Sequence, residues 1–400
     1  MVKAGYKDTE VGVIPDDWER LVIGDVVNFS GGSQPPRSTF TFKLQKGYLR
    51  LVQIRDYKTN AYETYVPEKL VKKICKKKDV MIGRYGPPIF QILRGLEGAY
   101  NVALIKAIPS KKVDNEYLFY FLKNDNLFKL MDMLSQRSSG QTGVELPALK
   151  AYPLPLPPLL EQRAISKVLS DVDTLIASLD KLIAKKRAVK TAAMQQLLTG
   201  KTRLPGFGEE KGYKDTEIGV IPEDWNVDKI CNFATITTGN KNTQDRIIEG
   251  QYPFFVRSQT IERINSYSFD GEAVLTAGDG VGTGKVFHYI NGKFNCHQRV
   301  YRISHFKPEL NGFYFFKYFS NFFFDRIMSM TAKSSVDSIR MEMIADMIIP
   351  VPYLKEQIAI AQILSDIDSE IDALQNRRKK INAIKQGMMQ ELLTGKTRLI

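Results

Sequence analysis

The sequence predicts an α+β protein in which two mixed α/β domains are joined by two long antiparallel helices. The helices are expected to form an intramolecular coiled coil in a circular, pseudo-two-fold repeat. A long helical stretch occurs twice, at 161–204 and 356–399, and a short motif also occurs twice, as YKDTEVGVIPDDW at 6–18 and YKDTEIGVIPEDW at 213–225. Different sequences lie between these repeated blocks. The chain is therefore a duplication with a repeated frame and two variable domains.

Each repeated stretch predicts one long helix, because apolar residues recur every three or four positions and proline is absent after its start. About 37 residues at roughly 1.5 Å per residue give a rod of about 55 Å. A small domain cannot cover such a rod, so its expected partner is its own repeat. The predicted spacer stripe comprises Ile165, Val168, Val172, Leu175, Leu179, Leu182, Ile360, Ile363, Ile367, Leu374, Ile381 and Ile384.

The repeated blocks divide the chain into five expected parts. These are a first variable domain (1–155), a first long helix (156–204), a linker (205–212), a second variable domain (213–350) and a second long helix (351–400). The C-terminal residues LTGKTRL match those that precede the linker. We therefore expect the C-terminus to lie close to the N-terminal motif, with the two rods packed antiparallel.

Both variable domains repeat one order of elements although their sequences differ. The first has strand-like runs at 48–54, 80–82 and 102–108 and one amphipathic helix at 116–134; the second has runs at 252–256, 273–276 and 298–303 and a helix at 312–330. Each domain then ends in a proline-rich segment that cannot be helical at its prolines. One fold with two different surfaces is expected.

Composition favours a globular protein with a polyanionic partner. The 400 residues are 43% hydrophobic and have a net charge of +13. The N-terminus shows no signal-peptide pattern, and no apolar run is long enough to span a bilayer. Three cysteines without metal-type spacing favour a reducing compartment. The expected location is the cytoplasm.

Positive charge is concentrated in the first variable domain. Residues 19–153 contain 22 basic and 12 acidic residues, a net charge of +10, whereas residues 226–349 have a net charge of +2. The run KKICKKK at 72–78 is equally well interpreted as a solvated strand or as a phosphate contact. Polar loops with Arg, Gln and Asn in both domains are candidates for reading base edges, with ordinary turn chemistry as the alternative for any one loop.

The candidate DNA-binding residues follow from this lysine run and these loops. They are Lys72, Lys73, Lys76, Lys77, Lys78, Arg84, Tyr85, Gln91, Arg94, Gln136, Arg137, Ser138, Lys241, Asn242, Gln244, Arg246, Gln298 and Arg299.

Catalytic motifs are not supported by the sequence. TGKT at 199–202 and 394–397 follows a helix rather than a strand, so a glycine at a helix end explains it better than a phosphate-binding loop. GDGVGTG at 278–284 favours a turn or a close approach to a ligand. Asp16, Asp56 and Lys58 have no equivalent in the second half, and three scattered histidines form no ligand set. We expect neither catalytic nor metal-binding residues.

These repeated blocks resemble the specificity subunit of type I restriction-modification systems. The resemblance covers nearly the whole chain and rests on the DTEVGVIPDDW motif and its repeat, on Glu-Gln after each proline-rich run, and on LLTGKTRL after each long helix. It implies two target recognition domains that each read one half of a bipartite, asymmetric DNA sequence. It implies no contact residues, because the variable domains cannot be matched to the family residue by residue.

The resemblance also implies partners and a non-catalytic role. Two methyltransferase subunits that use S-adenosylmethionine would dock on this chain, and restriction subunits that use ATP and Mg²⁺ would join them, whereas the chain itself would bind no cofactor. A second apolar stripe on the helices would then seat the recognition domains or the methyltransferase subunits; it comprises Leu169, Ile176, Ile183, Leu364 and Ile371.

Two other functions stay open at this stage. A stand-alone metal-dependent nuclease requires that Asp16, Asp56 and Lys58 come together. A structural coiled-coil scaffold without a nucleic-acid role predicts no salt-dependent DNA binding despite the basic first domain.

Overall fold

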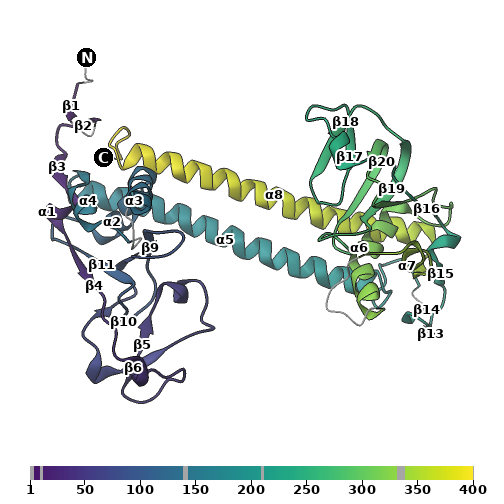
Figure 1. The fold of residues 1–400 in the computed structure, drawn as a ribbon, viewed down its shortest axis with the longest axis horizontal. Helices are drawn as coiled ribbons and strands as arrows, with labels where there is room; N and C mark the ends of the chain where they lie inside the picture. Colours follow the sequence, from purple (N-terminus) through teal and green to yellow (C-terminus); the bar gives the residue numbers. More distant parts are fainter. Residues whose placement is uncertain (1–3, 10–11, 138–142, 209–210, 331–337, 400) are drawn as a thin grey trace. The chain divides into compact units, whose positions relative to one another are not determined.

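The computed structural model describes residues 4–9, 12–137, 143–208, 211–330 and 338–399 (Figure 1). It divides into two compact units, Met1–Leu179 with Arg377–Ile400, and Asp180–Asn376. Each unit contains part of both long helices, α5 (Leu159–Leu197) and α8 (Leu354–Leu392). Helices and sheets occur in both units, so the predicted mixed class is confirmed. The five-part division expected from the sequence stays a prediction.

The first unit contains twelve named strands and four short helices among its described residues. The strands are β1 (Tyr6–Thr9), β2 (Gly12–Pro15), β3 (Glu19–Val22), β4 (Val27–Gly31), β5 (Tyr48–Val52), β6 (Tyr65–Pro67), β7 (Ile74–Cys75), β8 (Val80–Gly83), β9 (Gln91–Leu93), β10 (Gly98–Tyr100), β11 (Leu104–Pro109) and β12 (Pro153–Leu156). The helices are α1 (Ile23–Val26), α2 (Asn115–Leu122), α3 (Asp125–Arg137) and α4 (Leu146–Ala151), with 3₁₀ turns η1 (Arg37–Thr39), η2 (Ile54–Tyr57) and η3 (Glu68–Leu70).

The second unit repeats this plan. Its strands are β13 (Tyr213–Thr216), β14 (Gly219–Pro222), β15 (Asn226–Lys229), β16 (Thr235–Thr238), β17 (Tyr252–Phe255), β18 (Ile261–Ile264), β19 (Phe269–Ala277), β20 (Phe287–Cys296), β21 (Val300–Ser304) and β22 (Ile348–Val351). Its helices are α6 (Gly312–Ser329) and α7 (Met341–Ala345), with 3₁₀ turns η4 (Ile230–Asn232) and η5 (Thr243–Asp245).

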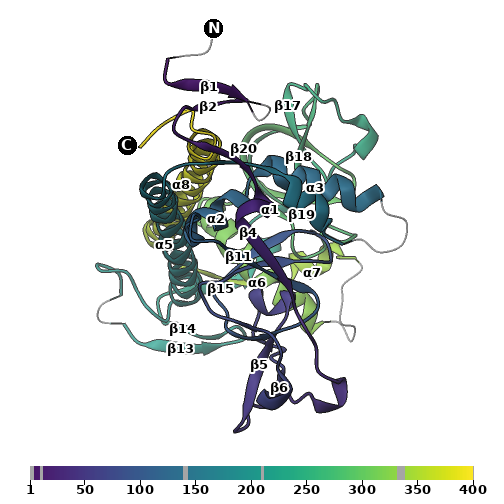
Figure 2. The same ribbon diagram turned by 90° about the vertical axis from the view of Figure 1, so that its left-hand side faces the viewer.

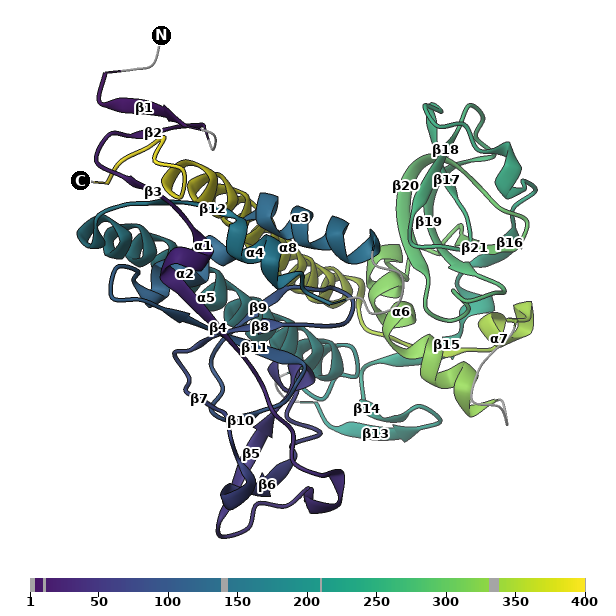
Figure 3. The same ribbon diagram turned by 60° about the vertical axis from the view of Figure 1, so that its left-hand side comes forward.

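The sheets of the two units pair equivalent strands. In the second unit one six-stranded sheet has the order β16-β21-β19-β20-β17-β18 (Figure 3). The first unit has two four-stranded sheets instead, β4-β11-β8-β9 and β6-β5-β10-β7. One parallel pair recurs in both, β5 with β10 and β17 with β20. The N-terminal hairpins also match, since β1 pairs with β2 and β13 with β14 in the same register.

One predicted helix is wrong in extent. The stretch 116–134 was expected to be continuous, but α2 ends at Leu122 and α3 begins at Asp125. The side chain of Asn124 accepts a hydrogen bond from the backbone N of Asn126 at 2.8 Å. Such an Asn side chain satisfies a backbone donor at a new helix start, which favours an interruption over a continuous helix. The second predicted helix, by contrast, is the single α6.

Segments of α5 and α8 pack antiparallel within each unit. In the first unit, Lys385 Nζ lies 2.6 Å from Asp173 Oδ1, while Arg398 beyond the end of α8 reaches Glu161 at the start of α5. In the second unit, Lys190 Nζ lies 2.5 Å from Asp368 Oδ1. Lys190 and Lys385 occupy the same place in the repeat, as do Asp173 and Asp368. The helix contacts therefore repeat with the sequence.

The buried face of the helices differs in part from the predicted spacer stripe. Ile165, Leu179 and Ile360 are buried as expected, and Val168, Val172, Ile367, Leu374 and Ile381 are half-buried. Four members lie at the surface, since Leu175, Leu182, Ile363 and Ile384 are 41%, 39%, 37% and 58% exposed. In the second apolar stripe, four residues are buried and Ile176 is half-buried. The buried residues are Leu169, Ile183, Leu364 and Ile371.

Leu169 and Leu364 of the second stripe pack on the domain cores, as do Ile165 and Ile360 of the predicted spacer stripe. Leu169 belongs to the cluster that includes Trp18 and Tyr117, and Leu364 belongs to the corresponding cluster with Trp225 and Tyr314. Each domain therefore covers one end of a helix, and this packing buries members of both apolar stripes there.

A buried glutamate at the start of α5 joins both ends of the repeat in the first unit. Glu161 accepts hydrogen bonds from Trp18 Nε1 at 2.9 Å and from Arg398 Nε at 2.6 Å. Arg398 Nη1 also donates to Asp17 at 2.9 Å. We call Asp17, Trp18, Glu161 and Arg398 the first clasp. The C-terminal residues therefore lie beside the N-terminal motif, as predicted (Figures 1 and 2).

The second unit contains the same arrangement. Glu356 accepts from Trp225 Nε1 at 3.0 Å and from Arg203 Nε at 2.6 Å, and Arg203 Nη1 donates to Asp224 at 2.9 Å. We call Arg203, Asp224, Trp225 and Glu356 the second clasp. The carboxylate of Asp224 has a lowered pKa because Arg203 donates hydrogen bonds to it.

The glycines of the two TGKT motifs end the long helices. Gly200 and Gly395 have φ of 69° and 72°, the left-handed region that glycine adopts without strain. A Cβ on Gly200 would also collide with Pro222, and one on Gly395 with Pro15. The motifs therefore serve helix termination and close packing on the repeated hairpins. Among the described residues, no helix has the length and apolar character needed to cross a bilayer.

Candidate nucleic-acid interface

Three backbone hydrogen bonds gather the loops at one edge of the second unit. His297 N donates to Phe255 O at 2.9 Å, and Gly278 N donates to Arg299 O at 2.8 Å. Ile339 N donates to Gly278 O at 2.7 Å. These bonds join the ends of β17, β19 and β20 to the segment before α7. We call residues 257–260, 278–286, 297–299 and 338–339 the second loop edge.

The first unit has the same three bonds between equivalent positions. Asn101 N donates to Val52 O at 3.2 Å, and Arg84 N donates to Ala103 O at 2.8 Å. Val144 N donates to Arg84 O at 3.1 Å. We call residues 53–56, 84–90, 101–103 and 143–144 the first loop edge. The two edges have one backbone geometry and different side chains.

A glycine in each unit brings a further loop onto this edge. A Cβ on Gly32, after β4, would collide with the carbonyl oxygen of Asn101. A Cβ on Gly239, after β16, would collide with the carbonyl oxygen of Cys296. Only glycine permits such an approach. The loops that follow, including Lys241 and Asn242 in the second unit, are thereby held against the edge.

Two arginines and one aspartate form the base of the second loop edge. Arg257 Nη1 lies 2.8 Å from Asp279 Oδ1, and Arg299 Nε lies 3.7 Å from Asp279 Oδ2. The two arginine side chains are 45% and 64% exposed. One carboxylate therefore orients two guanidinium groups and leaves excess positive charge on the surface, a combination suited to phosphates or guanine edges.

Amide groups extend this arrangement. Gln298 Nε2 donates to Asn242 Oδ1 at 2.6 Å, and Gln298 N donates to Lys241 O at 2.8 Å. His297 is buried behind them, and its Nδ1 accepts from Arg299 N at 2.9 Å. Burial, followed by the charge of Arg257, lowers the pKa of His297. A neutral ring is therefore favoured, as its acceptor role requires.

The first loop edge has aromatic and guanidinium groups instead. The Arg84 guanidinium lies over the Tyr85 ring, 5.2 Å from its centroid. Gln91 Nε2 donates to Pro88 O at 2.9 Å. Asn101 is buried, and its side chain accepts from Ala103 N at 3.2 Å. Stacked arginine and tyrosine present a planar cation suited to phosphate or base contact.

The structure thus brings part of the predicted set together at the loop edges. Arg84 and Tyr85 belong to the first edge, with Gln91 against it, and Gln298 and Arg299 belong to the second. Lys241 and Asn242 contact the second edge through Gln298.

Other predicted residues lie elsewhere. Arg94 forms an ion pair with Glu116 on α2 and lies 3.7 Å from the centroid of the Phe119 ring. It therefore serves the domain core, because a guanidinium between a carboxylate and a ring has little free surface. Gln136 bonds to Asp132 within α3, and Arg246 pairs with Glu262 on β18. Gln244 is exposed in η5. Ser138 and the side chain of Arg137 lie outside the described residues.

The lysine run at 72–78 follows the β7 edge of its sheet. Lys73 Nζ donates to Ser30 Oγ at 3.0 Å, and Lys77 Nζ lies 3.6 Å from Glu97. Lys72, Lys76 and Lys78 are exposed. The run therefore offers surface charge along β7, with Lys73 at the end near Tyr100 and Lys77 near Gly95, rather than a group that orients bases.

Sequence reasoning missed Arg257, Asp279 and the two glycines Gly32 and Gly239. Arg257 follows a predicted strand directly, and Gly239 is the first residue of the polar loop GNKNTQDR at 239–246, so their places in the chain were a usable signal. Their roles depend on contacts with residues 22 to 69 positions away, such as Asp279 and Asn101.

The nuclease hypothesis finds no support at Asp56. This side chain is buried, accepts from Gln53 N at 3.0 Å and lies near Arg50 and Arg55. Asp16 N instead bonds to Gly5 O at the N-terminal hairpin. Among the described parts of the chain, no cluster of three His, Cys, Asp or Glu side chains is arranged to hold a metal ion.

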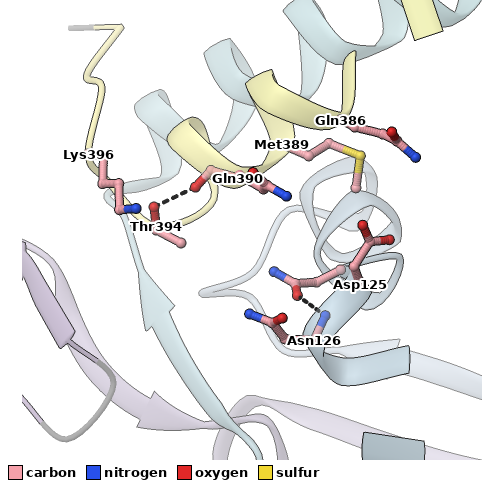
Figure 4. Close-up of a pocket in the computed structure, with 8 residues that line it drawn as sticks. Asp125, Asn126, Gln386, Met389, Gln390, Thr394 and Lys396 are labelled. Atoms are coloured by element: carbon pink, nitrogen blue, oxygen red, sulfur yellow. Dashed lines mark hydrogen bonds between the residues drawn. The ribbon is translucent and has the colours of Figure 1, made fainter. Parts of the chain in front are cut away.

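A polar pocket of about 190 Å³ lies between the start of α3 and the end of α8 in the first unit (Figure 4). Amide side chains make up half of its lining, which comprises Asn124, Asp125, Asn126, Gln386, Met389, Gln390, Thr394 and Lys396. Thr394 bonds to Gln390 O at 2.6 Å at its wall. These residues belong to the repeated frame, to α3 and to the connection before it, so we do not count them among the recognition residues.

Comparison with known proteins agrees with this architecture. The family described as "Type I restriction modification DNA specificity domain" matches twice, at residues 15–185 and 222–386. The MjaVIII type I restriction enzyme specificity subunit of Methanocaldococcus jannaschii is 28% identical over 96% of this chain and 94% of its own length. The putative MjaX specificity subunit of the same organism is 27% identical over 98% and 97%.

Solved structures share the fold. The S subunit of a type I restriction-modification system from M. genitalium has a TM-score of 0.61 at 13% identity and covers 94% of this chain and 96% of its own. A chain from a study of type I R-M complex assembly and conformational transition has a TM-score of 0.55 at 16% identity, covering 96% and 99%. With two family matches over most of its length and the duplicated frame described above, this chain belongs to the type I restriction-modification DNA specificity family.

Proposed function

We propose that this chain is the specificity subunit of a type I restriction-modification complex and that each loop edge reads one half of a bipartite, asymmetric DNA site. The observation that carries the proposal is the repeated edge geometry with different side chains, Arg84 and Tyr85 on one edge against Arg257 and Arg299 on the other. A common frame keeps the mode of docking, while different side chains select different bases.

The partners in this proposal are double-stranded DNA, two methyltransferase subunits and restriction subunits. The reactions belong to those partners, with S-adenosylmethionine on the methyltransferase and ATP and Mg²⁺ on the restriction subunits. This chain binds no cofactor and has no catalytic residue of its own. The two-fold repetition of the helical frame supports two equivalent docking surfaces. The complex works in the cytoplasm, where it meets DNA.

The long helices are proposed to set the gap between half-sites. Each is 39 residues long, which at roughly 1.5 Å per residue is about 58 Å. Linked binding modules gain affinity only when both sites lie at a distance that the connection allows. Half-sites about one DNA turn apart, roughly 34 Å, are common for duplicated readers.

An exchange of one domain tests the reading assignment. Residues 19–153 are replaced by those of a relative, and modified adenines are mapped in DNA from cells that also make the methyltransferase subunit. We expect one half of the site to change and the other to stay. A change in both halves, or in neither, would contradict independent reading.

A change in helix length tests the spacer. Insertion or removal of seven residues in both helices keeps the buried stripe in phase while altering the length. We expect the methylated sites to show a different gap between unchanged halves. An unchanged gap would contradict the spacer role.

Two outcomes would favour the other functions. Metal-dependent cleavage by the purified chain alone would indicate a nuclease. DNA binding that is absent, or insensitive to salt, would indicate a scaffold, because phosphate contacts make affinity strongly salt-dependent.

A further inference from the structure

The Gly-rich loop between β19 and β20 holds one apolar side chain fully in solvent. Val281 is 101% exposed, and it lies on the second loop edge, two residues after Asp279. An aliphatic side chain held there gains no burial in the isolated chain. A partner that covers it would recover that burial.

The turn that presents Val281 is fixed on both sides. Thr283 N and Oγ1 both donate to Gly280 O, at 3.0 Å and 2.6 Å. A Cβ on Gly282 would lie 2.6 Å from Arg257 O, and one on Gly284 would lie 2.5 Å from Ile327 Cδ1 of α6. The glycines therefore let the turn pack on the sheet edge and on α6. Val281 is held outward by a closed turn rather than by a free loop.

The surroundings of Val281 favour a polyanion. Arg257 and Arg299 meet at Asp279, at the base of the same turn, and Gly280 lies next to the Arg257 guanidinium. A protein partner that covered Val281 would also have to neutralise two exposed guanidinium groups. A DNA groove supplies phosphates and acceptor edges for both.

The first unit has a related apolar tip at the matching position. Gly86 and Gly280 both have positive φ, 100° and 81°, and each lies two residues after the backbone position that joins the loop edge. Exposed Pro87 and Pro88 follow Gly86, where Gly280 is followed by Val281. Both loops therefore present a stiff apolar tip, but with different side chains.

We infer that Val281 contacts the C5-methyl group of a thymine in the half-site read by the second unit. This inference rests on the proposed DNA-reading function. A thymine methyl is the one apolar group on the base edges, and it lies in the major groove. An isopropyl group held on the same loop edge as these two guanidinium groups can therefore select T·A at one position while the arginines contact phosphates or guanine.

The contact is tested by removing the thymine methyl group and the Val281 side chain, first separately and then together. The full complex, this chain with its methyltransferase subunits, is bound to duplexes carrying the mapped site. Each thymine of the half-site that the domain exchange leaves unchanged is replaced singly by deoxyuridine, which deletes only the methyl group. At one position we expect wild-type affinity to fall about three- to fivefold, the value of about one buried methyl group.

The Val281→Ala variant should lose a similar factor on the thymine duplex. It should then show no further loss with deoxyuridine, because the methyl group has no partner left. Ile248→Ala is the matched control: Ile248 is 94% exposed in the same domain but on another loop, so affinity and the deoxyuridine effect should stay as in wild type. Val281 has no packing to lose, so equal melting temperatures are expected for all three chains.

Three results would overturn the inference: deoxyuridine without effect at every position, an undiminished deoxyuridine effect in Val281→Ala, or a half-site without thymine. In each of these the complex still recognises its site, so only this contact fails. If the wild-type complex recognised no bipartite sequence, the proposed function itself would fail.

Discussion

The two loop edges carry side chains of different chemistry at the position after the shared backbone bond. In the first unit Tyr85 occupies it and lies against Arg84, whereas in the second unit Asp279 occupies it and pairs with Arg257 and Arg299. The backbone bonds around these positions are the same. A frame fixed by main-chain contacts thus leaves the side chains free to diverge, because the frame makes no demand on their chemistry.

The two clasps show the same relation with a different degree of burial. In the second clasp the side chains of Arg203 and Asp224 are 11% and 6% exposed, whereas in the first clasp those of Arg398 and Asp17 are 28% and 52% exposed. The two clasps therefore make the same hydrogen bonds, but the side chains of the first clasp are more accessible to water.

The difference between the two clasps should be largest when the glutamate of each clasp is replaced by alanine. Glu356→Ala leaves Arg203 without its main partner in a buried place, and we expect a loss of about 4 kcal/mol in the free energy of unfolding. Glu161→Ala should cost less, about 3 kcal/mol, because Arg398 can be rehydrated. Denaturant unfolding followed by tryptophan fluorescence measures both, since the two tryptophans each bond to one of these glutamates.

Glu→Gln at each position is the matched control. It keeps an acceptor for the tryptophan N–H but removes the charge, so a smaller loss is expected than for Ala. If Glu161→Ala cost as much as Glu356→Ala, burial would not distinguish the clasps.

The helix contacts provide the next comparison. Asp368 accepts from Lys317 and pairs with Lys190, while the equivalent Asp173 accepts from Lys385 and Tyr120. The Lys317 side chain is only 8% exposed. We expect Asp368→Asn to cost about 2 kcal/mol, because it leaves a buried ammonium group without its carboxylate, and Asp173→Asn about 1 kcal/mol. Chemical denaturation at pH 7 would show the order, and a reversed order would contradict it.

Acid should remove the Asp368 contribution. Burial alone would raise the pKa of this carboxyl group, but hydrogen bonds from Lys190 and Lys317 outweigh burial and lower it below 3.8. When folding lowers the pKa of a carboxyl group, its charged form stabilises the folded protein. This contribution is complete at pH values above the pKa of the unfolded state, and it is lost as the pH falls through the pKa of the folded state. The difference between wild type and Asp368→Asn should therefore be full at pH 5 and shrink below pH 3.8. A difference that persisted unchanged in acid would exclude the charge as its cause.

The unequal charge of the two domains predicts unequal salt dependence. Substitution of the exposed Lys76 and Lys78 by Gln should weaken DNA binding about tenfold at low salt. It should also lower the slope of log K against log salt by roughly 0.9 for each phosphate that is no longer neutralised. The double change Lys293→Gln with Lys307→Gln, at exposed positions of the second unit outside the second loop edge, is the matched control with a smaller expected effect.

Fluorescence anisotropy over a range of salt concentrations measures the affinity of both double variants for DNA. Equal effects would remove the distinction between the domains.

Lys123 gives the smallest expected effect and has no counterpart in the second unit. Tyr117 and Tyr314 make matching bonds to Pro155 O and Pro350 O, so the position of Lys123 corresponds to Ser320. Burial, followed by the charge of Lys385, lowers the pKa of Lys123 to about 8. The folded state therefore disfavours the ammonium form, and this cost is full below pH 8 and vanishes as the pH approaches 10.5.

Lys123→Met should accordingly stabilise the chain by about 1 kcal/mol at pH 7, with the gain declining between pH 8 and 10.5. Thermal melts across this range measure it. Ser320→Ala should show no such pH dependence. A gain that did not change with pH would indicate packing rather than charge.

Repetition in the sequence was sufficient for the frame. Apolar periodicity predicted both long helices, and the repeated motifs predicted their antiparallel packing and the return of the C-terminus to the N-terminal motif, which the structure forms through Arg398 and Asp17. These features depend on apolar periodicity and on identical motifs, which are local properties of the chain. Glycine at the ends of α5 and α8 was predicted for the same reason.

Burial within the helices was only partly predictable. The 3,4 spacing marks two neighbouring stripes, and Leu169 rather than Leu175 is buried because the first domain core also packs on that side. Likewise, at the break before α3 the Asn124 side chain accepts a hydrogen bond from Asn126 N, a local contact that periodicity does not indicate. Periodicity indicates which face of a helix is apolar, but it does not indicate what packs on that face.

The loop edges show the same division between sequence and structure. The sequence by itself determined the duplication, the two long helices and the polar, arginine-containing loops. Only the tertiary structure decided that Arg94 serves the core, that Arg257 joins Arg299 at Asp279, and that Val281 stands in solvent. Local patterns follow from neighbours along the chain, whereas a binding edge consists of residues from separate strands that only hydrogen bonding across the sheet brings together.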